Sequence, residues 1–216
     1  DDDIDLVGVQ FEVSESRYRS LDYFVSLVDS LVEDLADSGE VDLLVFPEYI
    51  NVPILAAEYL PEIQASASLD SALKRVLAHV DADSLGELLR RQSGRIHPEI
   101  LRAWRGIAER HGVAIIPGTF FVTRNNGELR NRTYVIDDRG RVVYQQDKVY
   151  LTPFERDVLH ISPGSLREAR PFRIEGGLFG VTICRDSYFS SWDERFERVD
   201  AWIDLRANGE LYSPAV

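Results

Sequence analysis

Three polar side chains follow apolar stretches of this sequence and together could carry out covalent chemistry. Cys184 is the only cysteine of the chain, and Glu48 and Lys148 are an acid and an amine that could serve it. A cysteine with a pKa of about 8.5 is mostly a thiol at neutral pH, so it needs a base to become a nucleophile. If Glu48 is buried, its pKa could rise and it could accept the thiol proton. Lys148 and the backbone N–H of Arg185 could then stabilise a developing oxyanion.

Each of these residues also has an ordinary interpretation when it is taken alone. A free cysteine most often packs as a small apolar side chain, and a glutamate after a strand is most often a solvated loop residue. The histidines are scattered over an irregular region, a helix end and a loop: His79, His97, His111 and His160. A Cys–His enzyme is therefore the poorer interpretation, and no spacing supports a metal site. We expect neither a metal nor a cofactor.

The first part of the chain predicts elements that would place the glutamate at a sheet edge. Residues 4–13 predict a strand, and apolar residues at three- and four-residue steps over 21–35 predict a helix. Ser14 or Ser16 could cap that helix. The near-continuous apolar run at 41–46 predicts a strand that is covered on both faces. Strand, helix and strand form a right-handed parallel crossover, and ligands bind at the carboxyl edge of such sheets.

The middle of the chain predicts covering helices and further strands. Residues 53–94 predict short helices with polar links, which fit ordinary covering helices, a lid or a dimer arm. Pro98 is a typical first residue of a helix, and the helix that it starts would end at Gly112. Residues 113–116 predict a buried strand. Residues 120–146 predict a β-meander, because the sequences NNG and DDRG mark two turns.

The last third of the chain would deliver the cysteine. Residues 148–156 mix a lysine and a glutamate with aromatic and apolar residues, which predicts an irregular, partly buried segment. Residues 172–174 and 178–183 flank a Gly-Gly pair and predict a hairpin whose second strand ends at Cys184. Residues 201–205 predict one more short strand.

The composition limits the classes of function. The net charge of −13 and the pI of about 4.7 argue against binding to nucleic acid and to anionic membrane surfaces. No apolar run is long enough to span a bilayer, and we see no charged-then-apolar leader. A single cysteine cannot form an internal disulfide, so nothing implies an oxidising compartment. We therefore expect a single cytoplasmic domain that binds neither nucleic acid nor membrane.

Three short blocks carry a resemblance to a known superfamily. They are residues 46–48 (FPE), 148–155 (KVYLTPFE) and 183–187 (ICRDS). Together with the sequence PGT at 117–119, they resemble the signature blocks of the nitrilase, or carbon–nitrogen hydrolase, superfamily, in its order of glutamate, lysine and cysteine. The resemblance runs from about Leu6 to the C-terminus. The sequence at 151–156 is similar to that of an amidase-like bacterial branch.

The resemblance implies a fold and an assembly. Members of the superfamily form a four-layer α-β-β-α sandwich, an α/β fold that is usually paired as a homodimer through helices of one outer layer. Members also continue well beyond the point that corresponds to Val216, with further strands and helices. The resemblance therefore implies that the single domain at 1–216 is incomplete at its C-terminus.

The resemblance also implies cleavage of a non-peptide carbon–nitrogen bond in a small amide. Cys184 would attack the amide carbonyl with help from Glu48, and Lys148 would hold the oxyanion. A thioester would form with release of ammonia or an amine, and water would then hydrolyse it. Glu155 matches the second glutamate of the amidase-type members, where it helps to position the substrate and to orient the lysine.

Residues beside the three blocks are candidates for contact with the substrate. Arg185 follows the nucleophile, where many members have an aromatic residue. It could lower the pKa of the cysteine, bind a substrate carboxylate or be a plain surface arginine. Tyr49 and Tyr150 adjoin the glutamate and the lysine, and we expect them in the substrate site or directly behind it.

Other reactions of the same three residues stay open. They are hydrolysis of a carbamoyl amide, hydrolysis of a nitrile and acyl transfer to an amine. Nitrile hydrolysis is the weakest of these, because nitrile-cleaving members tend to have Trp-Glu after the cysteine and this chain has Arg-Asp. A non-catalytic binding homologue is an alternative from another class.

Overall fold

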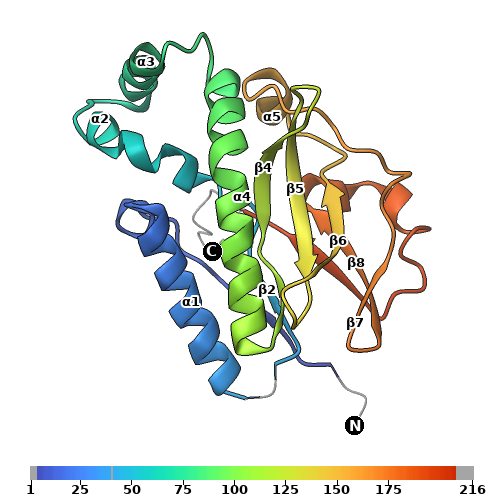
Figure 1. The fold of residues 1–216 in the computed structure, drawn as a ribbon. Helices are drawn as coiled ribbons and strands as arrows, with labels where there is room; N and C mark the ends of the chain where they lie inside the picture. The colour runs from blue at the N-terminus through green and yellow to red at the C-terminus, as the bar shows by residue number, and fades with distance from the viewer. Residues whose placement is uncertain (1–3, 40, 208–216) are drawn as a thin grey trace, which may run out of the picture.

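Two β-sheets packed face to face form the centre of the protein, and long helices cover one side (Figure 1). The computed structural model describes residues 4–39 and 41–207. The larger sheet contains β1 (Leu6–Gly8), β2 (Leu43–Val45), β3 (Ala114–Ile116), β4 (Thr119–Thr123), β5 (Leu129–Ile136) and β6 (Val142–Asp147). The smaller sheet contains β7 (Phe172–Ile174), β8 (Gly177–Ile183) and β9 (Ala201–Leu205).

The helices lie mostly in the first half of the chain. The α-helices are α1 (Leu21–Asp37), α2 (Leu60–Gln64), α3 (Leu69–Val80), α4 (Leu85–His111) and α5 (Pro153–Asp157). The 3-10 helices are η1 (Glu15–Tyr18), η2 (Pro53–Tyr59), η3 (Cys184–Tyr188) and η4 (Ser190–Trp192). Helix α4 ends at His111, and Gly112 after it has the left-handed φ of +63° expected of a glycine that follows a helix.

The larger sheet is parallel at one end and antiparallel at the other. β1, β2 and β3 are parallel neighbours, and Leu43 lies opposite Leu6 on one side and Ala114 on the other. Helices α1 and α4 lie on the crossovers between these strands, which confirms the predicted strand–helix–strand order. β5 pairs antiparallel with β3, β4 and β6, which confirms the predicted meander.

Alternate residues of the central strands enter two different cores, because successive side chains of a strand point to opposite faces. Leu44 and Ile115 pack with Phe24 of α1 and Trp104 of α4. The residues on either side of them pack with the smaller sheet; they include Leu43, Val45, Ala114, Ile116, Phe179, Val181 and Ile183. Figure 1 shows α1 and α4 on one side of the larger sheet and the smaller sheet on the other.

Two predicted features near the N-terminus are wrong. β1 has only three residues rather than the ten of 4–13, because its partner β2 offers three paired positions. The cap of α1 is Ser20, whose Oγ accepts a hydrogen bond from the Tyr23 N–H at 3.2 Å. Ser14 instead precedes η1 and makes no capping bond from its side chain, and Ser16 lies inside η1.

The prediction that Pro98 begins a helix is also wrong. Pro98 lies inside α4, which runs without a break from Leu85 to His111. An interior proline removes one backbone hydrogen bond and costs a helix about 3 kcal/mol. Residues before and after it, such as Ile96 and Ile100, are buried on the same face of α4. Burial of this continuous apolar face offsets the cost, so the packing keeps the two halves as one helix. Residues 53–94 are mostly helical, as their apolar spacing predicts.

The smaller sheet has no long helix over its outer face within the described ranges. The turns after Cys184 cover part of that face, and the ring of Phe196 lies directly against Gly180 of β8. Helices, larger sheet and smaller sheet are thus three of the four layers that the resemblance implies, and the α/β fold with two packed sheets is confirmed. Within residues 4–39 and 41–207, no helix combines the length and the apolar character needed to cross a membrane.

Gly118 holds a close approach between the ends of β2 and β3, and its replacement tests that constraint. Its φ is +69°, and a Cβ there would lie 2.1 Å from the carbonyl oxygen of Pro47. We expect Gly118→Ala to lower the free energy of unfolding by more than about 2 kcal/mol, because left-handed strain and a clash with backbone add together. Urea unfolding measures this loss.

Gly127→Ala is the matched control for that variant. Gly127 has a φ of +82°, but a Cβ added there would meet no atom within 4 Å. It should lose only about 1 kcal/mol, the cost of the left-handed backbone. Equal losses in the two variants would contradict the close approach.

Candidate active site

Cys184 stands where β8 ends and the chain turns sharply. Its φ is +50°, a left-handed conformation that is rare for a residue with a Cβ. β8 is held between β7 and β9, with Ile183 opposite Leu205, so the strand fixes the backbone up to the turn. The chain then enters η3, and Cys184 is only partly buried. This geometry presents the thiol beyond the sheet edge.

Glu48 stands just past the end of β2. The Phe46 N–H donates to the carbonyl of Ile116 on β3 at 2.8 Å, which extends the pairing up to Pro47. Tyr49 then has a φ of +64°, and its N–H donates to Thr119 Oγ1 at 3.0 Å. The chain therefore reverses directly after Glu48, and the Glu48 side chain is buried inside the protein.

Lys148 follows β6 and is one of the most buried side chains of the protein. Only 1% of it is exposed. Its Nζ lies 2.8 Å from Glu48 Oε1 and 3.0 Å from Glu155 Oε1. An ammonium that loses its water must gain charged partners, and these two carboxylates supply them. The structure thus brings three predicted site residues from three separate elements into contact.

Glu155 is delivered by α5, a short helix where the sequence predicts an irregular segment. Thr152 and Glu155 form a capping box: the Glu155 N–H donates to Thr152 Oγ1 at 3.2 Å, and the Thr152 N–H donates to Glu155 Oε2 at 2.8 Å. Tyr49 donates its hydroxyl proton to Glu155 Oε1. Arg156 pairs with Asp157 instead, so Glu155 is not part of a surface ion pair with its neighbour.

Asn131 is a member of this cluster for which the sequence predicts no role. It lies on β5, and its Nδ2 donates to Glu48 Oε1 at 3.0 Å and to Glu155 Oε1 at 3.1 Å. Its backbone carbonyl accepts from the Lys148 N–H at 2.8 Å. Asn131 therefore holds both carboxylates and the start of residues 148–152, the loop between β6 and α5 that we call the lysine loop. Asn131 stands among other polar residues of β5, including Arg130, Arg132 and Thr133, so no local signal marks this position.

The charges of the cluster set the protonation states of the resting site. Burial raises the pKa of Cys184 to about 11, the charge of Glu48 and a hydrogen bond with it raise the pKa further, and Lys148 opposes them. Burial raises the pKa of Glu48 in spite of Lys148. Burial opposes the charge of Lys148, but Glu48 and Glu155 outweigh it and raise the lysine pKa. The resting site therefore holds a neutral thiol beside a cation and a carboxylate of raised basicity.

This arrangement can perform acyl transfer. The carboxylate with the raised pKa can accept the thiol proton, and the ammonium can stabilise negative charge on an oxygen held near the sulfur. Burial raises the pKa of Glu155 too, but Lys148 and the Tyr49 hydroxyl outweigh it and lower that pKa. Glu155 therefore stays a carboxylate, which keeps the lysine protonated.

The remaining predicted site residues, Arg185 and Tyr150, both contact Phe189. The guanidinium of Arg185 lies over the ring of Phe189, 5.9 Å from its centre. The Tyr150 ring stacks on Phe189 at 3.7 Å between ring centres, and its hydroxyl lies 2.9 Å from Ser191 Oγ. Neither side chain has a hydrogen bond to the buried cluster among those found in the described ranges.

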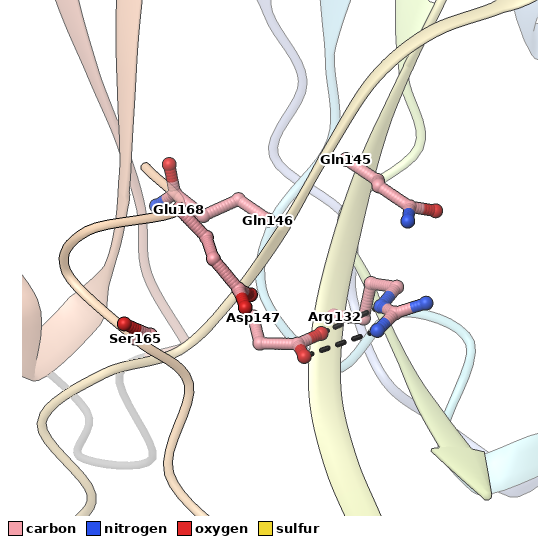
Figure 2. Close-up of a pocket in the computed structure, with 6 residues that line it drawn as sticks. All are labelled: Arg132, Gln145, Gln146, Asp147, Ser165 and Glu168. Carbon is pink, nitrogen blue, oxygen red and sulfur yellow. Dashed lines mark hydrogen bonds and ion pairs between the residues drawn. The ribbon is translucent and has the colours of Figure 1, made fainter. Parts of the chain in front are cut away.

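A small cavity beside β5 and β6 is separate from this cluster. Its volume is about 40 Å³, and it is lined by Arg132, Gln145, Gln146, Asp147, Ser165 and Glu168. Figure 2 shows the paired hydrogen bonds between Arg132 and Asp147, of 2.5 and 3.0 Å, beside it. Its lining includes none of the cluster residues. Across the described parts of the chain, no group of three or more His, Cys, Asp or Glu side chains is arranged to hold a metal ion.

Comparison with protein families identifies the chain. Residues 9–191 match the family described as carbon-nitrogen hydrolase, and this span includes Glu48, Lys148 and Cys184. The chain belongs to the carbon–nitrogen hydrolase family. Its membership agrees with the resemblance of the three blocks to the nitrilase superfamily. A comparison of this carbon–nitrogen hydrolase chain with curated protein sequences finds no match.

Solved structures share the fold at low sequence identity. The carbon–nitrogen hydrolase from Helicobacter pylori G27 matches with a TM-score of 0.65 and 17% identity over 98% of this chain and 62% of that chain. A variant of the amidase from Nesterenkonia sp. AN1, with acrylamide added to its active-site cysteine, matches with a TM-score of 0.61 and 17% identity. The match covers 96% of this chain and 69% of that chain. Saccharomyces cerevisiae Nit3, of the nitrilase superfamily, matches with a TM-score of 0.58 and 16% identity. The match covers 95% of this chain and 63% of that chain. This carbon–nitrogen hydrolase chain therefore spans less than two thirds of the first of these relatives.

The thiol titration of Cys184 tests the electrostatics of the cluster. We expect Glu48→Gln to lower the pKa of Cys184 from about 11 to below about 10, because the negative charge disappears while Lys148 remains. The pH dependence of the rate of alkylation by iodoacetamide follows thiolate formation, and the single cysteine identifies the alkylated site. Asp204→Asn is the control. Asp204 also raises the pKa of Cys184 but is a smaller cause, so this variant should lower that pKa by less than Glu48→Gln does. A thiol pKa that stays at about 11 or rises in Glu48→Gln would refute this account.

The stability of a Lys148 variant tests the burial of the charges. Lys148→Met should lower the free energy of unfolding by about 3–5 kcal/mol, because it leaves buried carboxylates without their cation. Lys148→Met combined with Glu48→Gln should recover part of that loss, since one of the two charges is then gone. Urea unfolding of the single and double variants gives both values. A double variant less stable than the single one would show that the carboxylates do not repel each other.

Proposed function

We propose that the protein hydrolyses the carbon–nitrogen bond of a small, non-peptide amide through Glu48, Lys148 and Cys184. The observation that carries this proposal is the Lys148 ammonium, which is held between two buried carboxylates beside the only thiol. A buried ion pair contributes little to stability compared with apolar packing. A fixed cation in a dry site is, however, an effective stabiliser of an oxyanion.

The first half of the proposed reaction forms a thioester. The Cys184 sulfur bonds to the amide carbonyl carbon while its proton passes to Glu48. The carbonyl electron pair moves onto oxygen, where Lys148 and the backbone N–H of Arg185 stabilise it. The carbon–nitrogen bond then breaks, and the nitrogen leaves as ammonia or an amine with the proton from Glu48.

The second half regenerates the enzyme. Glu48 takes a proton from water as the water oxygen bonds to the thioester carbon. The carbon–sulfur bond breaks, the carboxylic acid leaves and the proton returns from Glu48 to the thiolate of Cys184. The raised pKa of Glu48 suits this exchange, because the same carboxylate must gain and lose a proton in each half.

Other residues have supporting roles in the proposal. Glu155 orients Lys148 and keeps it charged, and Tyr49 holds Glu155 from behind. Arg185 and Tyr150 border the entrance for the substrate, supported by their common contact with Phe189. A homodimer remains an expectation from the resemblance to the superfamily, and a cytoplasmic location remains an expectation from the sequence.

Ammonia release from a panel of small molecules tests the proposal. The panel contains acetamide, propionamide, an ω-amido acid, an N-carbamoyl amino acid and a nitrile. We expect release from at least one simple amide, and a loss of at least about 10³-fold in Cys184→Ala, because the nucleophile is gone. Glu128→Gln, at an exposed side chain on the β4–β5 hairpin, is the control that should retain activity.

Two results would decide against the amidase proposal. Release from the carbamoyl compound or the nitrile alone would move the substrate class while the three residues keep their roles. No release from any compound, by protein whose cooperative thermal unfolding shows that it is folded, would favour a non-catalytic binding homologue.

A further inference from the structure

We propose that Asp186 is a positioning residue that fastens the turn around Cys184, residues 183–186, to the lysine loop. This inference rests on the proposed function, because it concerns how Cys184 and Lys148 are held at a fixed position relative to each other. Asp186 is two residues after the nucleophile, and none of its surface is exposed. It neither contacts the buried carboxylates nor takes part in the proton transfers described above.

The Asp186 carboxylate accepts hydrogen bonds from both segments. Its Oδ1 accepts from the N–H groups of Tyr150 at 2.7 Å and Val149 at 3.1 Å, directly after the lysine. Its Oδ2 accepts from the N–H of Ile183, directly before the cysteine, at 3.4 Å. One carboxylate therefore bridges the residues next to both reacting groups.

This bridge also crosses the boundary between the two sheets. The lysine loop is tied to the larger sheet, since the Lys148 N–H donates to the Asn131 carbonyl at 2.8 Å. The cysteine ends β8 of the smaller sheet. Apolar contacts between the sheets fix their separation but carry no directional information. A hydrogen-bonded link is needed to fix how one strand end lies relative to the other.

A second polar link keeps the sheets docked when Asp186 is changed. Gln146, two residues before the lysine, donates from its Nε2 to the carbonyl of Val181 on β8 at 2.8 Å. The loss of Asp186 should therefore loosen the last residues of each segment without separating the sheets.

The energetics also favour a positioning role over a stabilising one. Burial raises the pKa of Asp186 to about 7, although hydrogen bonds from Tyr150, Ile183 and Val149 and the charge of Lys148 lower it. Keeping this carboxylate charged thus costs free energy. An asparagine would keep an oxygen for the lysine loop but would turn its NH₂ group toward the Ile183 N–H, and two donors cannot bond.

The test compares Asp186→Asn with Asp137→Asn. Asp137 is a matched control: it is also buried and accepts from the backbone N–H groups of Arg139 and Arg141, but it lies at the β5–β6 turn. On an amide that the wild type hydrolyses, Asp186→Asn should lower kcat about 10- to 100-fold with KM changed less than about threefold. Its thermal unfolding midpoint should stay close to that of the wild type. Asp137→Asn should lose thermal stability and keep kcat.

Alkylation of Cys184 by iodoacetamide at about pH 7.5 keeps this test separate from the proposed function. Asp186→Asn should slow alkylation at least about fivefold, because the thiol no longer lies in line with its base, while Asp137→Asn should not. If the wild type hydrolyses no amide, the amidase proposal fails and the alkylation result still decides the role of Asp186.

Wild-type kcat and alkylation rates in Asp186→Asn would overturn the inference. So would losses that the control reproduces at an equal loss of thermal stability. If Asp186→Asn does not fold, Asp186→Ser is measured by the same criteria, because serine is smaller and keeps one acceptor oxygen. Asp186→Ser should also lower kcat and the rate of alkylation of Cys184.

Discussion

The burial of the Lys148 ammonium is the constraint on which the rest of this structure depends. A charged amine removed from water costs several kcal/mol unless carboxylates and hydrogen bonds replace the water. Glu48 and Glu155 provide that replacement, and Asn131 donates a hydrogen bond to each of these carboxylates. The three residues come from three different elements. The ends of β2 and β6, the interior of β5 and the short helix α5 must therefore converge before the lysine can be buried. The charges hold one another in place, and the result is a rigid cation beside a thiol.

Backbone strain at two strand ends helps to position the residues of the site. Tyr49 and Cys184 both have left-handed φ values, although neither is a glycine. Such a conformation costs of order 1 kcal/mol and persists only where the surroundings determine it. Here the paired strands and the hydrogen bond from Tyr49 N–H to Thr119 hold the strain. Its effect is to turn Glu48 inward and to present the cysteine at the end of its strand.

The site lies at the seam between the two sheets. The larger sheet carries the glutamate, the lysine and the asparagine, and the smaller sheet carries the nucleophile. The apolar core between the sheets provides most of the stabilisation, but apolar contacts allow small displacements. Directional links such as Gln146 to the Val181 carbonyl and the Asp186 carboxylate are what can fix reacting atoms to within an ångström. Catalysis of the proposed kind requires that precision.

The sequence by itself determined the order of strands and helices around the parallel crossovers, the meander and the positions of Glu48, Lys148 and Cys184 at strand ends, because apolar periodicity and turn residues are local signals. It overestimated the length of β1. It did not determine that α4 continues through Pro98, where packing against the sheet outweighs a local preference. Only the tertiary structure decided that Asn131 and Asp186 serve the site. Their partners lie up to 83 residues away for Asn131 and 37 for Asp186, and no local pattern specifies which distant N–H or carboxylate a buried polar group will meet.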